Sequence, residues 1–232
     1  MEAVEARSVD HPDARFCTVC ETASERFQKG GTGKGRENAR CPQCGSLERH
    51  RLLWLHLAER VWPSLTDRKI DILHIAPEPF FVERLKFRPD VNYISGDIEM
   101  SQSMAKMDLT DIQFWDAQFD LVICSHVLEH IPDDQRAMRE MHRILRDAGT
   151  LIVMVPLAGE RTDEDFSITT PQERLERFGQ ADHVRIYGRD IKDRLDASGF
   201  ETVFWPSPEH VRPALLRFIA APGRTVIECR KT

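Results

Sequence analysis

The chain has 232 residues, a formal net charge of −6 and a pI near 5.9, with 41% hydrophobic and 30% charged residues. This balance is typical of a soluble globular protein with room for one α/β domain and a small appendage. Net acidity disfavours broad binding to nucleic acid, and no apolar run reaches the ~20 residues of a membrane span. Because the first residues lack a secretion signal pattern, the expected location is cytoplasmic.

The first motif in chain order consists of two cysteine pairs. Cys17, Cys20, Cys41 and Cys44 have the spacing C-x2-C-x20-C-x2-C, which closes a tetrahedral thiolate site when each pair sits on a tight turn. The polar, glycine-rich loop between the pairs cannot build its own core, so a metal would stabilise it. Two disulfides are the alternative, which the missing secretion signal disfavours. The spacing therefore predicts a four-cysteine module over 1–46 with structural Zn²⁺, because four thiolates leave no open position for catalysis.

An apolar stripe at helical spacing follows and predicts a linking helix over 47–69. From residue 70 to 232 the pattern alternates between strands and helices, which favours a parallel sheet covered on both faces. Gly149 and Gly199 are expected at helix ends. Strands are expected at 70–76, 92–97, 119–125, 149–155, 201–205 and 225–230, and helices at 78–87, 134–147 and 189–198.

Polar residues follow the strands at the sheet edge where such folds bind ligands, beyond the carboxyl ends of the first strands. Asp97 ends the second strand, Asp108 lies in the next loop, and Ser125 and His126 end the strand after that. An acid about 20 residues after the first turn suits hydrogen bonds to ribose hydroxyls. Each acid alone is more often a cap or turn residue, so the prediction depends on their joint order.

The stretch "FDLVICSHVLEHIPD" and the following "RAMREMHRILRDAGTLIVMVP" resemble class I S-adenosylmethionine-dependent methyltransferases of the type 11 kind. The resemblance covers roughly 70–232 and implies a Rossmann-like α/β sheet with an antiparallel last strand, here behind a zinc-ribbon module with four cysteines. It implies S-adenosylmethionine as cofactor, with Asp97 on the ribose and Asp108 with the Leu109 amide on the adenine. The backbone of Ser125 and His126 would lie near the methionine part.

The first turn, Ala76-Pro77-Glu78-Pro79, departs from that family because it contains no glycine, and His74 replaces the family's usual acid. Glycine matters most for a pyrophosphate, which needs several backbone N–H groups. S-adenosylmethionine has no phosphate, and a carboxylate such as Glu78 can serve its cationic parts. Ala76, Pro77 and Glu78 are therefore expected to bind the cofactor without glycine.

The letters "HVLEH", His126 to His130, also match the zinc-peptidase pattern H-x-x-E-H. That pattern needs one continuous helix, so that both histidines share a face. A strand runs up to Ser125 and Pro132 follows the motif, so the sequence disfavours the hydrolase interpretation.

The polar segment 158–188 is too long for a simple connection and is expected to be a substrate lid beside the methyl-transfer site. Its "FGQADHVRIYG" resembles a stretch in uncharacterised methyltransferases that also carry a zinc ribbon. His183 is the candidate general base, with Tyr187 next, because an oxygen or nitrogen acceptor can need a proton removed. Gln180 and Arg185 are the candidate substrate-binding residues, Arg185 for an anionic group. Bracing of the loop is the alternative role for these residues.

The acceptor class stays open between two kinds of molecule. Acidic net charge favours a small metabolite or sugar-like molecule methylated on oxygen or nitrogen. RNA is the alternative, because some ribosomal RNA methyltransferases carry an N-terminal zinc module and because basic residues gather near the cysteines. A non-catalytic protein that binds the cofactor and docks partners is a third possibility. The basic residues are Lys29, Lys34, Arg36, Arg40, Arg49 and Arg51.

Overall fold

The computed structural model describes residues 15–31, 35–64, 68–100, 103–206, 219, 221 and 224–232. The chain divides into two compact units, Met1–Arg68 with Phe204–Val226, and Lys69–Val203 with Ile227–Thr232. The second unit thus begins close to the boundary expected at residue 70, whereas 204–226, expected within the sheet domain, groups with the first unit. Among the described residues, none of the helices has the length and apolar character needed to cross a membrane.

The first unit contains two small hairpins and a helix. Strand β1 (Arg15–Cys17) pairs with β2 (Thr22–Ser24), and β3 (Gln28–Gly30) pairs with β4 (Arg36–Arg40), both antiparallel. Helix α2 (Glu48–His56) continues into a π-helical turn, η1 (Leu57–Val61), and a 3-10 turn, η2 (Trp62–Ser64). Within the segment 47–69, where a linking helix is predicted, regular α-helix runs from Glu48 to His56; residues 65–67 lie outside the described part.

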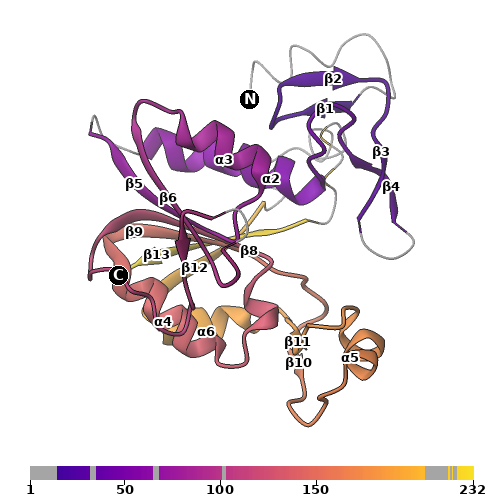
Figure 1. Cartoon of the computed structure of the whole chain (residues 1–232), viewed down its shortest axis with the longest axis vertical. Helices are drawn as coiled ribbons and strands as arrows, with labels where there is room; N and C mark the ends of the chain where they lie inside the picture. Colours follow the sequence, from indigo (N-terminus) through magenta and orange to yellow (C-terminus); the bar gives the residue numbers. More distant parts are fainter. Residues whose placement is uncertain are drawn as a thin grey trace. The chain divides into compact units, whose positions relative to one another are not determined.

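The second unit is built around a seven-stranded sheet in the order β12-β13-β9-β8-β5-β6-β7 (Figure 1). Neighbours from β7 to β9 pair in parallel, and β13 runs antiparallel to β9. The parallel core and the antiparallel last strand confirm the predicted sheet. The strands are β5 (Ile70–Ile75), β6 (Val91–Asp97), β7 (Ala105–Lys106), β8 (Phe119–Ser125), β9 (Leu145–Met154), β12 (Phe200–Trp205) and β13 (Val226–Lys231).

Both faces of this sheet are covered, as its sequence requires. Strands β5 and β8 are near-continuous apolar runs, which is typical of parallel strands buried on both sides. Helix α3 (Pro79–Lys86) covers one face, and α4 (Asp134–Ile144) with α6 (Ile191–Ala197) covers the other (Figure 1). Helix α4 buries Ala137, Met138, Met141 and Ile144, which lie on one helical face.

The helix predicted over 134–147 is wrong at its end. Helix α4 stops at Ile144, and β9 begins at Leu145. Leu145 pairs with Phe119 at the start of β8, and the register then shifts before regular pairing resumes. Gly149 therefore does not end the helix, and Ala148 takes the left-handed conformation there with φ 59°. Gly199, with φ 98°, does follow α6 as predicted.

Segment 158–188 is an ordered insertion rather than an irregular loop. Strand β10 (Asp163–Glu164) pairs antiparallel with β11 (Arg185–Ile186), and α5 (Pro171–Phe178) lies between them. Thr170 caps α5, Pro171 occupies its first turn, and Gly179 ends it with φ 82°. At the base, the Ala158 N–H donates to the carbonyl of Tyr187 at 2.8 Å, so the insertion leaves and rejoins the fold at one place.

Candidate functional site

The carboxyl edge of β5 and β8 is the position where an open α/β sheet of this topology binds its ligand. The chain runs from β5 outward through β6 and β7, then returns to β8 and β9 on the other side of β5. Ligands of such sheets lie beyond the carboxyl ends of the strands at this reversal. The Rossmann-like fold thus brings the predicted cofactor residues of the first, second and fourth strands of this sheet to one edge.

Two residues at this edge adopt left-handed backbone conformations without being glycine. Ala76 follows β5 with φ 47°, and His126 follows β8 with φ 57°. Such conformations cost roughly 1 kcal/mol or more and cluster at ligand sites. Ala76 thus adopts the kind of backbone geometry that glycine usually supplies in these turns. The absence of glycine therefore does not prevent the turn from forming. The Ala76 N–H donates to the Gly96 carbonyl at 2.9 Å, which fixes the turn to β6.

Glu78, at the start of α3, is held by a buried histidine. His74 Nε2 lies 3.0 Å from Glu78 Oε2, and His74 Nδ1 lies 3.0 Å from the Tyr93 hydroxyl. His74 is fully buried, and burial raises the pKa of Tyr93, so the phenol stays neutral. His74 thus orients the Glu78 carboxylate within the first turn.

The acids after β6 lie at exposed turns. Asp97 Oδ1 accepts the Glu99 N–H at 2.9 Å. Asp108 Oδ1 accepts both the backbone N–H and the hydroxyl of Thr110 at 2.8 Å, and these bonds lower the pKa of Asp108. The lowered pKa keeps Asp108 ionised near neutral pH, and the second carboxylate oxygen of each residue is not used by these turn contacts. Leu109 is buried beside Asp108.

Ser125 and His126 form the end of β8. The His126 N–H donates to the Met154 carbonyl at 2.7 Å, which ties the strained residue to β9. The Ser125 hydroxyl is buried and has no hydrogen-bond partner among the described residues. Such an orphan is rare, and a ligand or ordered water normally satisfies it.

A cluster of carboxylate and imidazole groups lies next to His126. The ligand atoms of Glu129, His130 and His183 all lie within 4.8 Å of one another. Glu129 belongs to a 3-10 turn, η3 (Leu128–His130), and His183 comes from the insertion. Glu129 Oε2 and His183 Nε2 are both buried without a partner in the described part of the chain. Burial lowers the pKa of His183, so its ring is neutral near pH 7.

The other predicted residues of the insertion are engaged in packing. Arg185 is 1% exposed and its guanidinium donates to the carbonyls of Leu128, Ile131 and Pro132 and to Glu164. Four of its five N–H groups are thus engaged within the protein, which gives Arg185 a structural role; its predicted role in binding a substrate anion stays a prediction. The sequence could not reveal this, because the partners are mainly backbone oxygens.

Tyr187 and Gln180 also have contacts within the insertion and its neighbours, and their predicted roles stay predictions. Tyr187 is fully buried, and its hydroxyl donates to Asp134 Oδ2 at 2.6 Å. Burial and the Asp134 carboxylate raise its pKa, so the hydroxyl is a poor base at neutral pH. Gln180 is half-buried, and its backbone carbonyl accepts the His183 N–H at 3.4 Å. The structure thus brings His183, but not the Tyr187 hydroxyl, to the cluster.

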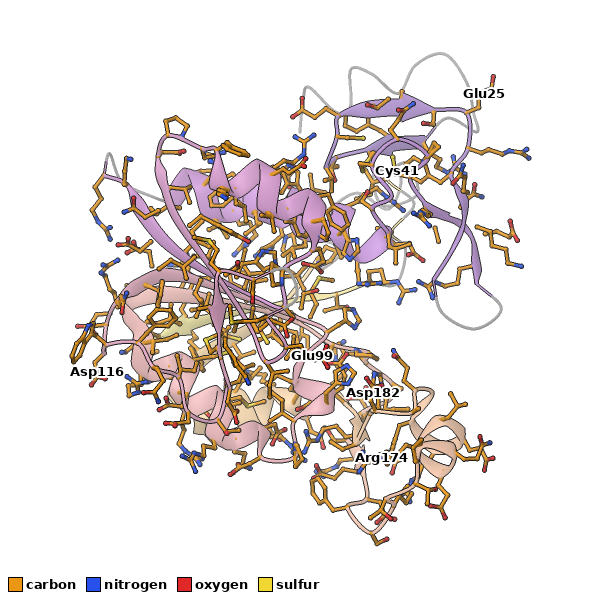
Figure 2. The ribbon with its side chains drawn as sticks, viewed as in Figure 1. Glu25, Cys41, Glu99, Asp116, Arg174 and Asp182 are labelled. Carbon is orange, nitrogen blue, oxygen red and sulfur yellow. The ribbon has the colours of Figure 1, made fainter. Side chains whose placement is uncertain are left out.

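The cysteine module brings its four predicted ligands together, Cys41 among them (Figure 2). The Sγ atoms of Cys17 and Cys44 are 3.6 Å apart, and those of Cys20 and Cys41 are 3.7 Å apart. These separations exclude disulfides, and all four thiols are free. A tetrahedral zinc with Zn–S bonds of about 2.3 Å has edges of about 3.8 Å. The cluster therefore fits a tetrahedral metal.

The zinc-peptidase interpretation of "HVLEH" fails on backbone geometry. His126 has a left-handed φ of 57°, and only Leu128–His130 form a 3-10 turn. No continuous helix aligns His126 with His130, which confirms the prediction made from Pro132.

Comparisons with known proteins find that part of this chain is similar to a known domain family. Residues 64–153 match the family described as "Methyltransferase domain". Ajmaline N-methyltransferase from Rauvolfia serpentina is 29% identical over 123 residues, covering 53% of this chain and 38% of that protein. The chain thus spans well under half the length of this curated relative.

Solved structures share the fold at low identity. The [4+2]-cyclase SpnF has a TM-score of 0.54 and 16% identity, covering 88% of this chain and 87% of its own. The YcgJ protein from Bacillus subtilis has a TM-score of 0.50 and 15% identity, covering 78% of this chain and 98% of its own. Because a cyclase shares the fold, the fold alone does not define the reaction.

Proposed function

We propose that the protein transfers a methyl group from S-adenosylmethionine to an acceptor molecule. The observation that carries this proposal is the carboxyl edge of the sheet, where Ala76, Asp97 and His126 follow three adjacent strands. The match of residues 64–153 to a methyltransferase domain supports it. The cofactor supplies an activated methyl group, and the protein's task is then to align the acceptor and exclude water.

The residues at this edge suit the parts of that cofactor. Asp97 suits the ribose hydroxyls, and Asp108 with the Leu109 amide suits the adenine. Glu78, held by His74, offers a carboxylate to the cationic methionine end, next to Ala76 and Pro77. The orphaned Ser125 hydroxyl and the backbone at His126 complete the set.

Calorimetry with S-adenosylmethionine tests the proposal. We expect binding by the wild type and a loss of about 1–3 kcal/mol in Asp97→Ala, the scale of hydrogen bonds to a charged group. Asp90→Ala is the matched control, because Asp90 precedes β6 and pairs with Arg88 at the opposite end of that strand. Absence of binding by the wild type would refute the proposal.

For the acceptor we favour a small molecule over RNA. The named substrate of the ajmaline N-methyltransferase supports this choice. The basic residues near the cysteines do not act as one free patch: Arg36 pairs with Glu48, and Lys29 lies near Glu37. Arg51 is fully buried and donates to backbone carbonyls. Lys34 lies outside the described residues.

A tritiated-methyl transfer assay on fractionated cell extract tests the acceptor class. Label in small molecules that survives nuclease would support our choice, whereas label removed by nuclease would favour RNA. Cofactor binding without transfer to any pool would favour a non-catalytic docking protein. The general-base role of His183 stays a prediction.

We also propose that Cys17, Cys20, Cys41 and Cys44 bind one structural Zn²⁺. Sulfur separations of 3.6 and 3.7 Å support tetrahedral coordination. The Ser46 hydroxyl lies 3.1 Å from Cys17 Sγ and 3.2 Å from Cys44 Sγ, so it can donate to a thiolate. Four thiolates leave no open coordination position, so this metal would stabilise the module rather than react.

A further inference from the structure

The cluster of Glu129, His130 and His183 has ligand atoms without any assigned role. Two imidazoles and one carboxylate lie within 4.8 Å of one another, next to the end of β8. Glu129 and His183 are 1% and 2% exposed, and each keeps one polar atom without a hydrogen-bond partner among the described residues. Two buried polar atoms without hydrogen-bond partners destabilise a fold unless a ligand or a metal ion contacts both.

Each of the three side chains is oriented by a contact through its other polar atom. Glu129 Oε1 lies 3.1 Å from His126 Nδ1, which leaves Oε2 free. His183 Nδ1 lies 3.2 Å from the Phe178 carbonyl, which fixes the tautomer whose Nε2 carries the lone pair. The same arrangement recurs at His130.

His130 Nδ1 lies 3.2 Å from Asp182 Oδ2, so its Nε2 is the atom left for a ligand. Asp182 lies on the insertion, where Figure 2 labels it, and is the negative partner of this ring. Metal-binding histidines commonly donate the other ring N–H to a carboxylate or backbone carbonyl in this way. The outer contacts thus have the form found around metal ligands.

We propose that Glu129, His130 and His183 bind a divalent transition-metal ion, separate from the cysteine cluster. Two imidazoles with one carboxylate favour metals such as Zn²⁺, Fe²⁺ or Co²⁺ over Mg²⁺ and Ca²⁺, which prefer oxygen ligands. Coordination at about 2.1 Å places tetrahedral ligand atoms about 3.4 Å apart, within reach by small side-chain adjustments. Three protein ligands leave an open position for water or a substrate oxygen.

The ligand set differs from that of a zinc peptidase, because His126 orients Glu129 and His183 supplies the third ligand. The insertion is required for the site, since it carries both His183 and Asp182. The proposal concerns metal binding alone and does not depend on methyl transfer. A metal-bound His183 Nε2 has no lone pair left for a proton, so binding would replace its predicted base role.

Metal analysis and calorimetric titration with Zn²⁺ test the proposal on the full chain. We expect two Zn²⁺ per chain in the wild type and one in Glu129→Gln, His130→Gln and His183→Asn, or a weakening at that site of at least 10-fold. His142→Gln is the matched control, because His142 also has a buried, unpartnered Nε2 but packs on Phe200, away from the cluster. It should keep both metals.

Two further measurements test the proposal even if substitution of the buried Glu129 or His183 prevents folding. Asp182→Asn alters a side chain that is 69% exposed and should weaken the second site about 10-fold without unfolding. Loading with Co²⁺ should give d–d bands without thiolate charge transfer in Cys41→Ser protein. One metal per chain in folded wild type, lost only with the cysteines, would overturn the proposal, as would unchanged Zn²⁺ affinity in folded Glu129→Gln.

Discussion

His74 Nε2 contacts Glu78 Oε2 at 3.0 Å, while the opposite ring nitrogen contacts the Tyr93 hydroxyl. This chain of three side chains runs from the sheet interior to the first turn of the candidate cofactor site. These contacts explain how a turn without glycine still has a defined geometry, because the buried His74 fixes the side chain of Glu78, the N-cap residue of α3.

Replacing His74 by Leu should therefore destabilise the protein and weaken cofactor binding together. The Tyr93 hydroxyl and the Glu78 carboxylate would each lose their contact with His74, at a cost of about 0.5–3 kcal/mol for each hydrogen bond. Urea unfolding and calorimetry with S-adenosylmethionine measure the two effects. Tyr93→Phe is the control: it keeps the His74–Glu78 contact and should lose stability while binding the cofactor almost normally.

Ala76→Gly should leave stability unchanged or raise it by up to about 1 kcal/mol, because glycine adopts the left-handed conformation at no steric cost. Ala137→Gly in the buried face of α4 should instead lose about 1 kcal/mol or more. Thermal unfolding of both variants checks the contrast. A destabilisation of Ala76→Gly equal to that of Ala137→Gly would show that Ala76 is not strained.

Arg185→Met should cost several kcal/mol, about 1–3 kcal/mol for each buried backbone carbonyl that loses its donor, whereas Glu164 keeps its ion pair with Arg194. If Arg185 instead held a substrate anion, the variant would unfold normally and only its KM would rise. Denaturant unfolding and steady-state kinetics separate the two results. Arg174→Met is the matched control, and its effect on the free energy of unfolding should be nearly zero. Arg174, labelled in Figure 2, lies on helix α5.

The contact of the insertion with α6 should weaken in acid. Arg194 lowers the pKa of Glu164 below its usual 4.5, chiefly through a direct hydrogen bond. A carboxyl whose pKa is depressed on folding stabilises the fold above its unfolded pKa, and this contribution is lost as pH falls through the folded value. Protection factors in 171–178, which correct exchange rates for the intrinsic effect of pH, should therefore fall between about pH 5 and pH 3. In Glu164→Gln the exchange should already be faster at pH 7, with less change on acidification.

Removal of zinc should reduce the stability of the first unit before that of the second. Cys41→Ser should lose the cysteine-bound metal, because a hydroxyl does not replace a thiolate, and hydrogen exchange should rise in residues 15–46. Cys124→Ala removes a buried thiol of β8 and should keep this metal. A Cys41→Ser protein that retains its full zinc content would contradict the assignment.

Much of the sheet was predictable because its signals are local. The apolar runs of β5 and β8 and the alternation of elements are written into the sequence, and so is the cysteine spacing. The error at α4 is instructive, since residues 145–147 continue a helical pattern but Leu145 pairs with Phe119 at the start of β8. Tertiary pairing overrode local preference there, and Ala148 rather than Gly149 adopts the left-handed turn.

The candidate site was less predictable, because its side chains come from positions that are far apart in the sequence. Glu129 and His183 are 54 positions apart, and no spacing rule connects them. Arg185 and Tyr187 were expected to be functional because polar residues in a lid often are. Their partners are Asp134 and the carbonyls of 128–132, which only the folded insertion brings within reach.

The anchoring of Arg185 has a consequence for how this fold can diversify. Its guanidinium fastens the insertion to the carbonyls of Leu128, Ile131 and Pro132, whereas α5 exposes most of its surface. Sequence changes in α5 can therefore alter what the outer surface recognises without loosening the base. If the predicted lid role holds, selection on acceptor preference and selection on folding would act on separate residues of one short segment.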